Sequence, residues 1–183
     1  MTKLVLVRHG EAAAGWSDDL DPGLSEKGAE QAERVAKELA SLSPRRIYSS
    51  PMRRCQETAA PLARLWSVTP KVDARVGEIQ APDHDVATRG PWLAEVLSKR
   101  WIELPADQQA WRASVIDALI EMTEDCIVFT HFVAINAAIG AAIADGRVVI
   151  HRVGNCSTTT FESDGSSLAL VELPPEPTRT EVL

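Results

Sequence analysis

The stretch KLVLVRHGEAA, residues 3–13, indicates both the fold and the place of a functional site. Four consecutive apolar residues, Leu4 to Val7, are typical of a short buried strand. Arg8, His9 and Gly10 follow this run directly. Burying an arginine beside a histidine costs free energy unless a partner supplies the opposite charge. We therefore expect these side chains to face a cleft that receives an anion.

Composition excludes several classes of protein. The 183 residues are enough for one domain with a sizeable core. A net charge of −7 disfavours a non-specific nucleic-acid binder. No apolar run approaches the roughly 18 residues of a membrane span, and the first residues lack the layout of a secretory leader. The three cysteines match neither a disulfide framework nor a zinc pattern. We therefore expect a cytoplasmic protein without a nucleic-acid or membrane partner.

Hydrophobic periodicity predicts alternating strands and helices along most of the chain. The expected strands cover residues 3–8, 46–50, 72–76, 126–130, 147–153, 157–163 and 168–173. The expected helices cover residues 25–42, 51–66, 92–104, 107–122 and 132–144, and residues 80–91 are expected to be irregular. Ser50 and Pro51 have the residue types of an N-cap and a first helical position.

This alternation predicts an α/β fold, a three-layer α/β/α sandwich with a mostly parallel sheet. The last strands follow one another without helices, so we expect an antiparallel edge strand. We expect a single domain over residues 1–173. Residues 174–183 contain three prolines and alternating charges, and we expect them to be a mobile tail.

Three polar clusters follow three of the predicted strands. Arg8 and His9 follow the first, residues 50–54 the second, and His131 the strand at 126–130. Ligands of parallel sheets bind beyond the carboxyl ends of the strands, so these clusters are expected to meet. The planar fork of Arg54 matches phosphate oxygens, and the helix beginning near Phe132 offers free N–H groups. The sequence therefore predicts a phosphate site.

The same residues suggest a reaction. Neighbouring arginines lower the pKa of His9, which keeps its imidazole neutral and nucleophilic. Attack on phosphorus would give a phosphohistidine, with the arginines and a protonated His131 stabilising the charge. The leaving alkoxide needs a proton. Glu78, just after the expected third strand, is the best placed donor, with Asp83 and Asp85 in reserve.

Several segments together resemble the histidine phosphatase superfamily, also called phosphoglycerate mutase-like. The segments are LVLVRHGE at 4–11, DPGLSEKGAEQA at 21–32, IYSSPMRRCQETA at 47–59, CIVFTH at 126–131 and NCSTTTF at 155–161. The resemblance implies the phosphoglycerate mutase-like fold. It also implies a histidine acid-type phosphatase, a phosphoric monoester hydrolase that needs neither metal nor cofactor.

The resemblance carries roles to matching positions. His9 matches the nucleophile, and Arg8 matches the arginine that binds phosphate beside it. Arg54, three residues after the proline, matches the second arginine. His131 matches the second phosphate-binding histidine, and Glu78 matches the usual proton donor.

The sequence departs from the family pattern at three places. Gly15 stands where mutases and many sugar phosphatases have asparagine, and EIQAPDHD at 78–85 replaces a G-x-W-E-G-like stretch. Phe132 replaces the usual glycine after the second histidine, so its N–H can bind phosphate while its ring narrows the pocket. These departures favour a phosphatase over a mutase. The expected substrate is a small phosphomonoester, with a phosphoprotein as an alternative.

Three other functions compete with this hypothesis. A phosphoglycerate mutase-type phosphotransferase would use the same pocket. A non-catalytic module would bind a phospho-ligand if Glu78 were misplaced. A metallohydrolase would use His9, His131 and a carboxylate, but two arginines in the same pocket would repel a cation.

Overall fold

The structure is a computed structural model that describes residues 1–15, 18–82 and 86–177. Within these residues, six strands form one sheet in the order β3-β2-β4-β1-β5-β6. Their bounds are β1 Thr2–Arg8, β2 Arg46–Ser49, β3 Lys71–Val72, β4 Cys126–Thr130, β5 Thr158–Ser163 and β6 Leu168–Glu172. Strands β3, β2, β4 and β1 pair in parallel, whereas β5 pairs antiparallel with β1 and with β6. The predicted mostly parallel sheet with antiparallel pairing at one edge is confirmed.

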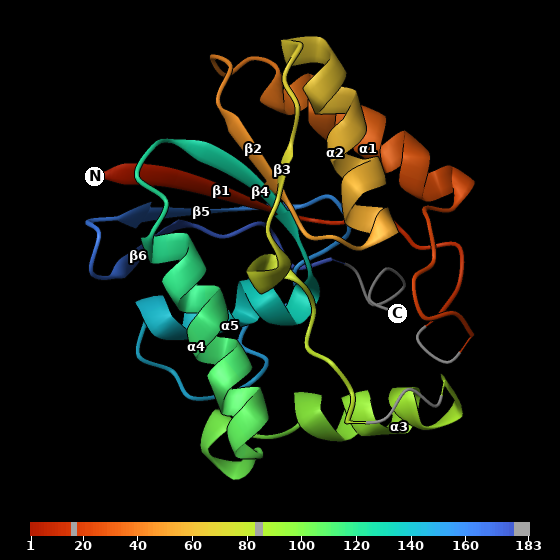
Figure 1. Ribbon diagram of the computed structural model, residues 1–183, viewed down its shortest axis with the longest axis vertical. Helices are drawn as coiled ribbons and strands as arrows, with labels where there is room; N and C mark the ends of the chain where they lie inside the picture. The colour runs from red at the N-terminus through yellow and green to blue at the C-terminus, as the bar shows by residue number, and fades with distance from the viewer. Residues whose placement is uncertain (16–17, 83–85, 178–183) are drawn as a thin grey trace.

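Helices cover both faces of the sheet (Figure 1). The long helices are α1 Glu26–Leu39, α2 Arg53–Trp66, α3 Val86–Leu97, α4 Ala106–Ile120 and α5 Phe132–Ala142. Helices α1 and α2 lie on one face, α4 and α5 lie on the other, and α3 stands apart at the bottom of the view. The predicted three-layer sandwich is therefore confirmed. No helix in the described part of the chain is long and apolar enough to cross a bilayer.

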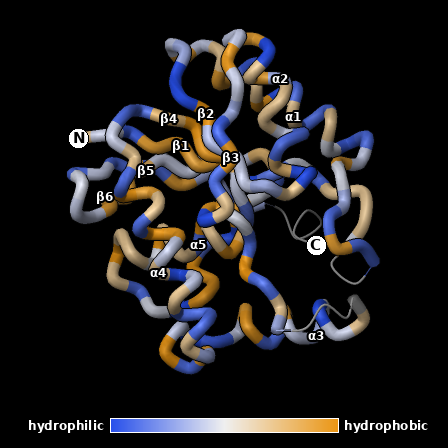
Figure 2. Tube along the Cα trace, in the orientation of Figure 1, coloured by the Kyte–Doolittle hydropathy of each residue, from blue (hydrophilic) through white to orange (hydrophobic). Residues whose placement is uncertain are grey.

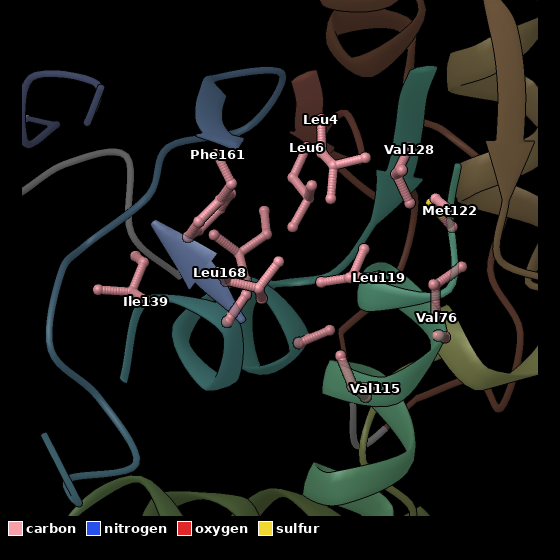
Figure 3. Close-up of a cluster of buried hydrophobic side chains, with 14 of the residues drawn as sticks. Leu4, Leu6, Val76, Val115, Leu119, Met122, Val128, Ile139, Phe161 and Leu168 are labelled. Atoms are coloured by element: carbon pink, nitrogen blue, oxygen red, sulfur yellow. The ribbon is translucent and has the colours of Figure 1, made fainter. Parts of the chain in front are cut away.

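The apolar run of β1 is explained by this double cover. Side chains alternate between the faces of a strand. Val5 and Val7 belong to the core beneath α1 and α2, and Leu4 and Leu6 belong to the core beneath α4 and α5. Figure 3 shows Leu4 and Leu6 on the side of the sheet that carries Phe161 and Leu119. In Figure 2 the strands at the centre of the sheet are correspondingly hydrophobic.

The prediction of a strand at 72–76 is wrong beyond its first residue. Strand β3 ends at Val72, and a short 3-10 helix follows over Ala74–Val76. The Asp73 carboxylate accepts a hydrogen bond from the Arg75 backbone N–H at 2.9 Å. This local bond caps the 3-10 turn and ends the strand.

The helix predicted at 92–104 is displaced, and part of the predicted irregular segment is helical. Helix α3 begins at Val86 and contains Pro91, a residue of the segment predicted to be irregular. The second half of the predicted helix is a 3-10 turn, Trp101–Glu103. The Trp101 N–H donates to the Gly146 carbonyl at 2.9 Å, and this distant contact separates the turn from α3.

The strand predicted at 147–153 is also wrong. The Asn136 side-chain oxygen on α5 accepts hydrogen bonds from the N–H groups of Ile150 and His151, at 2.8 and 2.9 Å. The Val148 N–H donates to the Lys99 carbonyl at 3.0 Å. These partners take the backbone groups that a sheet would need, so only an isolated bridge between Arg100 and Arg147 remains.

The start of α2 lies two residues later than predicted. Its N-cap is Met52, which has no capping side chain, and Pro51 precedes the helix. The Asp21 carboxylate accepts from the Arg53 N–H at 2.9 Å and so serves the helix end from another loop.

The first residues of the predicted tail contact the domain. The Pro174 carbonyl lies 2.8 Å from the His151 ring Nε2, and the Glu176 carboxylate accepts from the Arg152 N–H at 3.3 Å. Residues 178–183 lie outside the described part, and the mobility of the tail stays a prediction.

A close approach of two glycines holds the loop after β1 against α1. A Cβ on Gly28 would lie 2.0 Å from the Glu11 carbonyl oxygen, and one on Gly10 would lie 2.6 Å from the Gly28 carbonyl oxygen. Both neighbours are backbone atoms, which cannot move aside like a flexible side chain. The position of the loop that follows His9 therefore depends on glycine in the first turn of α1.

We expect Gly28→Ala to destabilise the protein, although alanine favours helix by about 1 kcal/mol. Forcing the loop away from α1 should cost about 1–3 kcal/mol beyond that gain. Urea unfolding measures the difference. Glu30→Ala, at an exposed position on the same helix, should change stability by less than about 0.5 kcal/mol. A Gly28→Ala protein as stable as the wild type would contradict the close approach.

Candidate active site

The site lies at the carboxyl ends of the neighbouring strands β1, β4 and β2. Beyond the strands, the His9 N–H donates to the Thr130 carbonyl at 3.0 Å, and the Ser50 N–H donates to the Phe129 carbonyl at 3.0 Å. The parallel register pairs Arg8 with Thr130. These bonds place the residues that follow each strand beside one another.

His9 is oriented by the backbone. Its Nδ1 lies 2.8 Å from the Gly10 carbonyl oxygen, which can only accept a hydrogen bond. Nδ1 therefore carries the proton and Nε2 keeps its lone pair. The side chain is 8% exposed. Burial lowers the pKa of His9 well below its ordinary value, and the charges of Arg54 and Arg8 lower it further. The ring is thus neutral and nucleophilic.

His131 lies against His9 and Arg54. The two imidazole rings meet edge to face with centroids 5.2 Å apart. The Arg54 Nη2 lies 3.2 Å from the His131 Nδ1. Burial lowers the pKa of His131, and His9, Arg54 and Arg8 add to this effect. Without an anion in the pocket, this ring is neutral too.

Arg8 adds a second guanidinium. Its Nη1 donates to the Val153 carbonyl at 2.8 Å, and the group lies over the Phe132 ring, 5.3 Å from the centroid. Its buried Nε has no hydrogen-bond partner among the described residues. Burial lowers the pKa of Arg8 to about 10, while Glu78 opposes this shift. The group remains charged at neutral pH and offers a donor to an anion.

The Glu78 carboxylate lies at the N-terminus of α5, and the residue is 4% exposed. Its carboxylate accepts from the Ile79 N–H at 3.0 Å and from the Val133 N–H at 3.3 Å. Burial raises its pKa to about 7, against the opposing effects of these hydrogen bonds and of Arg54 and Arg8. A carboxyl group with this pKa can give and take a proton near neutral pH.

The combined arrangement suits phosphate. Two guanidiniums and two imidazoles converge on one place, and Phe132 is the first residue of α5, where an N–H has no acceptor within the helix. Arginine donors match a tetrahedral oxyanion. Across residues 1–15, 18–82 and 86–177, no group of three or more His, Cys, Asp or Glu side chains is arranged to hold a metal ion.

A family model, described as histidine phosphatase superfamily (branch 1), matches residues 4–174. The chain belongs to this superfamily. The family resemblance drawn from the motifs is therefore confirmed.

Named relatives include phosphatases and a mutase. The chain is 36% identical over 115 residues to phosphoserine phosphatase 1 of Hydrogenobacter thermophilus, an alignment that covers 57% of this chain and 53% of that protein. It is 28% identical to a 2,3-bisphosphoglycerate-dependent phosphoglycerate mutase of Thermoplasma acidophilum, over 86% of each chain. The chain thus spans about half the length of the first of these relatives.

A solved structure supports the fold. A mycobacterial glucosyl-3-phosphoglycerate phosphatase, in complex with VO3, superposes with a TM-score of 0.75 at 23% identity. The match covers 97% of this chain and 100% of that chain. The similarity in fold therefore extends over nearly the whole protein.

The histidine phosphatase fold gathers the residues singled out from the sequence. Arg8, His9, Arg54 and His131 lie together, and Phe132 begins α5 beside them. Glu78 is near enough to interact electrostatically with both arginines. Their catalytic and binding roles stay proposals. The reserve donors Asp83 and Asp85 lie outside the described residues.

Two supporting residues were not identified from the sequence. Thr58 of α2 accepts a hydrogen bond from the Gly10 N–H at 3.0 Å, and Asn155 donates its side-chain amide to the His9 carbonyl at 3.0 Å. Both residues lie inside motifs that resemble the family, at 47–59 and 155–161. Membership of these motifs was the one sequence feature that could have pointed to them. Buried Arg89 of α3 was missed as well, since its segment was predicted to be irregular; its charge interacts with that of Arg54.

We expect neither His9 nor His131 to titrate between about pH 6 and pH 8 in the phosphate-free protein, because burial and the arginines disfavour imidazolium. Ring ¹⁵N NMR measures this directly. In the urea-unfolded protein both should titrate near the ordinary value of about 6.5. A folded-state midpoint near that value would contradict the burial of the two rings.

Proposed function

We propose that the protein is a metal-independent phosphatase that hydrolyses a phosphomonoester through a phosphohistidine on His9. The observation that carries the proposal is the 2.8 Å contact between His9 Nδ1 and the Gly10 carbonyl. It leaves the Nε2 lone pair available for attack, in a pocket where Arg8 and Arg54 supply positive charge. The two arginines also argue against a metal at the same place, since they would repel it.

In the first step, His9 Nε2 forms a bond to phosphorus as the ester P–O bond breaks. Arg8, Arg54 and His131 stabilise the charge on the three equatorial oxygens. Glu78 gives its proton to the leaving alkoxide, so the alcohol departs neutral. The enzyme then holds a phosphohistidine and a carboxylate.

In the second step, water attacks the phosphohistidine. The Glu78 carboxylate takes a proton from this water as the new P–O bond forms. The P–N bond breaks, its electron pair returns to His9 Nε2, and inorganic phosphate leaves. Both residues return to their starting states, so atoms and protons balance.

The substrate we propose is a small phosphomonoester, as in the relatives named for phosphoserine and glucosyl-3-phosphoglycerate. A phosphoprotein is the alternative. We also propose that the enzyme is a histidine acid-type phosphatase. This proposal rests on Glu78, whose pKa of about 7 keeps the carboxyl group protonated below neutral pH. We further propose one domain over residues 1–173. A cytoplasmic location is consistent with the three free cysteines Cys55, Cys126 and Cys156.

We expect wild-type protein to hydrolyse p-nitrophenyl phosphate in EDTA, and His9→Ala to lose activity on the order of a thousandfold or more, because the nucleophile is gone. Radiolabelled substrate should leave an acid-labile, base-stable label on the wild-type protein only.

His151→Ala is the matched control, because it removes a histidine that contacts the Pro174 carbonyl instead of the site. It should retain activity. Undiminished activity in His9→Ala would overturn the phosphohistidine route, and dependence on added metal would favour the metallohydrolase. Binding of vanadate without turnover of any phosphomonoester would favour the binding module. Interconversion of phosphoglycerates faster than their hydrolysis would favour a mutase.

We expect Glu78→Gln to lower kcat/KM for an alkyl phosphate such as phosphoserine by about 100-fold or more, because the alkoxide then lacks a proton donor. The loss should be smaller for p-nitrophenyl phosphate, whose leaving group needs less help. In the wild type, kcat/KM for the alkyl ester should fall as pH rises through about 7, where Glu78 loses its proton. Equal losses on both esters would assign the proton to another group.

A further inference from the structure

The imidazole of His131 has a defined tautomer. The ring is fully buried, and its Nδ1 lies 3.2 Å from the Arg54 Nη2. A guanidinium can donate hydrogen bonds but cannot accept them. In the neutral ring, this contact favours the tautomer in which Nδ1 accepts and the proton resides on Nε2.

That Nε2 proton needs an acceptor of its own. The Ser50 Oγ lies 2.8 Å from Nε2, an ordinary length for a hydrogen bond to a hydroxyl oxygen. The Cys55 Sγ lies 3.3 Å away, but a thiol sulfur accepts only weakly. Its S–H points to the Thr130 carbonyl at 3.4 Å. Ser50 is therefore the principal partner of Nε2.

Ser50 is itself rigidly held. It is fully buried directly after β2, and its N–H continues the sheet ladder to Phe129. Its Oγ also accepts from the Met52 N–H at 3.2 Å, just before α2 begins. With two donors directed at it, this oxygen faces His131 as an acceptor.

We propose that Ser50 is a positioning residue that keeps the proton of His131 on Nε2 and so keeps Nδ1 on the side of Arg54 and the phosphate. This inference rests on the proposed function for its catalytic consequence. When a phosphoryl group enters, a second proton can be added only at Nδ1. The resulting imidazolium then donates from Nδ1 to phosphate and from Nε2 to Ser50.

The groups around His131 make this assistance necessary. His9 and Arg8 approach it from the end of β1, and Arg54 and Cys55 approach it from α2. Burial and the charges of Arg54 and Arg8 disfavour a charged His131 ring. A hydrogen bond to a charged donor is worth more than one between neutral groups, so the Ser50 oxygen helps the ring accept its second proton.

The test compares Ser50→Ala, Ser50→Cys and Cys55→Ala with the wild type. Ser50→Cys keeps the side-chain shape with a slightly larger atom and replaces the oxygen with a poor acceptor. Cys55→Ala removes the other Nε2 neighbour and leaves the hydroxyl. The first readout is the tautomer of His131, from ring ¹⁵N NMR of the phosphate-free protein. The second is the pH profile of kcat for p-nitrophenyl phosphate, which reports groups that titrate in the enzyme–substrate complex.

We expect only the Nε2–H tautomer in the wild type and in Cys55→Ala, and a population of Nδ1–H in both Ser50 variants. Activity of the Ser50 variants should fall about tenfold to a hundredfold, the equivalent of a hydrogen bond to a charged group. The alkaline limb of kcat should move to lower pH in these variants, because the charged ring of the enzyme–substrate complex loses an acceptor. Cys55→Ala should stay within about twofold of wild type.

Three outcomes would overturn the proposal. The first is a wild-type tautomer and pH profile in both Ser50 variants. The second is wild-type behaviour of Ser50→Cys beside a damaged Ser50→Ala, which would mean packing. The third is a loss of activity in Cys55→Ala equal to that in the Ser50 variants. If Ser50→Ala does not fold, Ser50→Cys decides. The tautomer needs no turnover, so an inactive wild type that still responds at His131 would refute the phosphatase and leave the positioning role standing.

Discussion

The hydrogen bond from the His9 N–H to the Thr130 carbonyl is the constraint on which the site depends. It extends the parallel ladder between β1 and β4 by one residue beyond the strands. Because side chains alternate along a strand, a slip of one residue in this ladder would turn His9 away from His131. The equivalent bond from Ser50 to Phe129 aligns β2 in the same way. Three segments distant in sequence thus present their polar ends at one edge.

The charged groups at this edge of the sheet explain why it suits an anion. Arg8 and Arg54 are held there with two imidazoles whose pKa values are lowered, and a buried carboxyl group has its pKa raised to about 7. The two guanidiniums are costly to bury in the absence of an anion. A phosphoryl dianion would relieve this cost and would favour a protonated Glu78 and a protonated His131, which links the stability of the pocket to the chemistry proposed for it.

The backbone of the loop after β1 is tied to the rest of the domain at several points. The Gly10 carbonyl orients His9, while Thr58 holds the Gly10 N–H and Asn155 holds the His9 carbonyl. Gly28 allows α1 to approach the following loop. His9, the proposed nucleophile, is preorganised by these contacts, so the proposed reaction needs little reorganisation.

The sequence by itself determined the fold class and most of the site. An apolar run that ends in Arg8 and His9, and helical periodicity between such runs, depend only on local pattern, and the structure confirms the sheet and places the marked residues together. The predictions from sequence were wrong at 92–104 and 147–153. There, backbone N–H groups donate hydrogen bonds to the distant residues Gly146 and Asn136. The sequence also could not reveal that Ser50 meets His131, 81 residues away. Such contacts follow from strand order and register, which only the tertiary structure decides, because local periodicity does not encode which strands become neighbours.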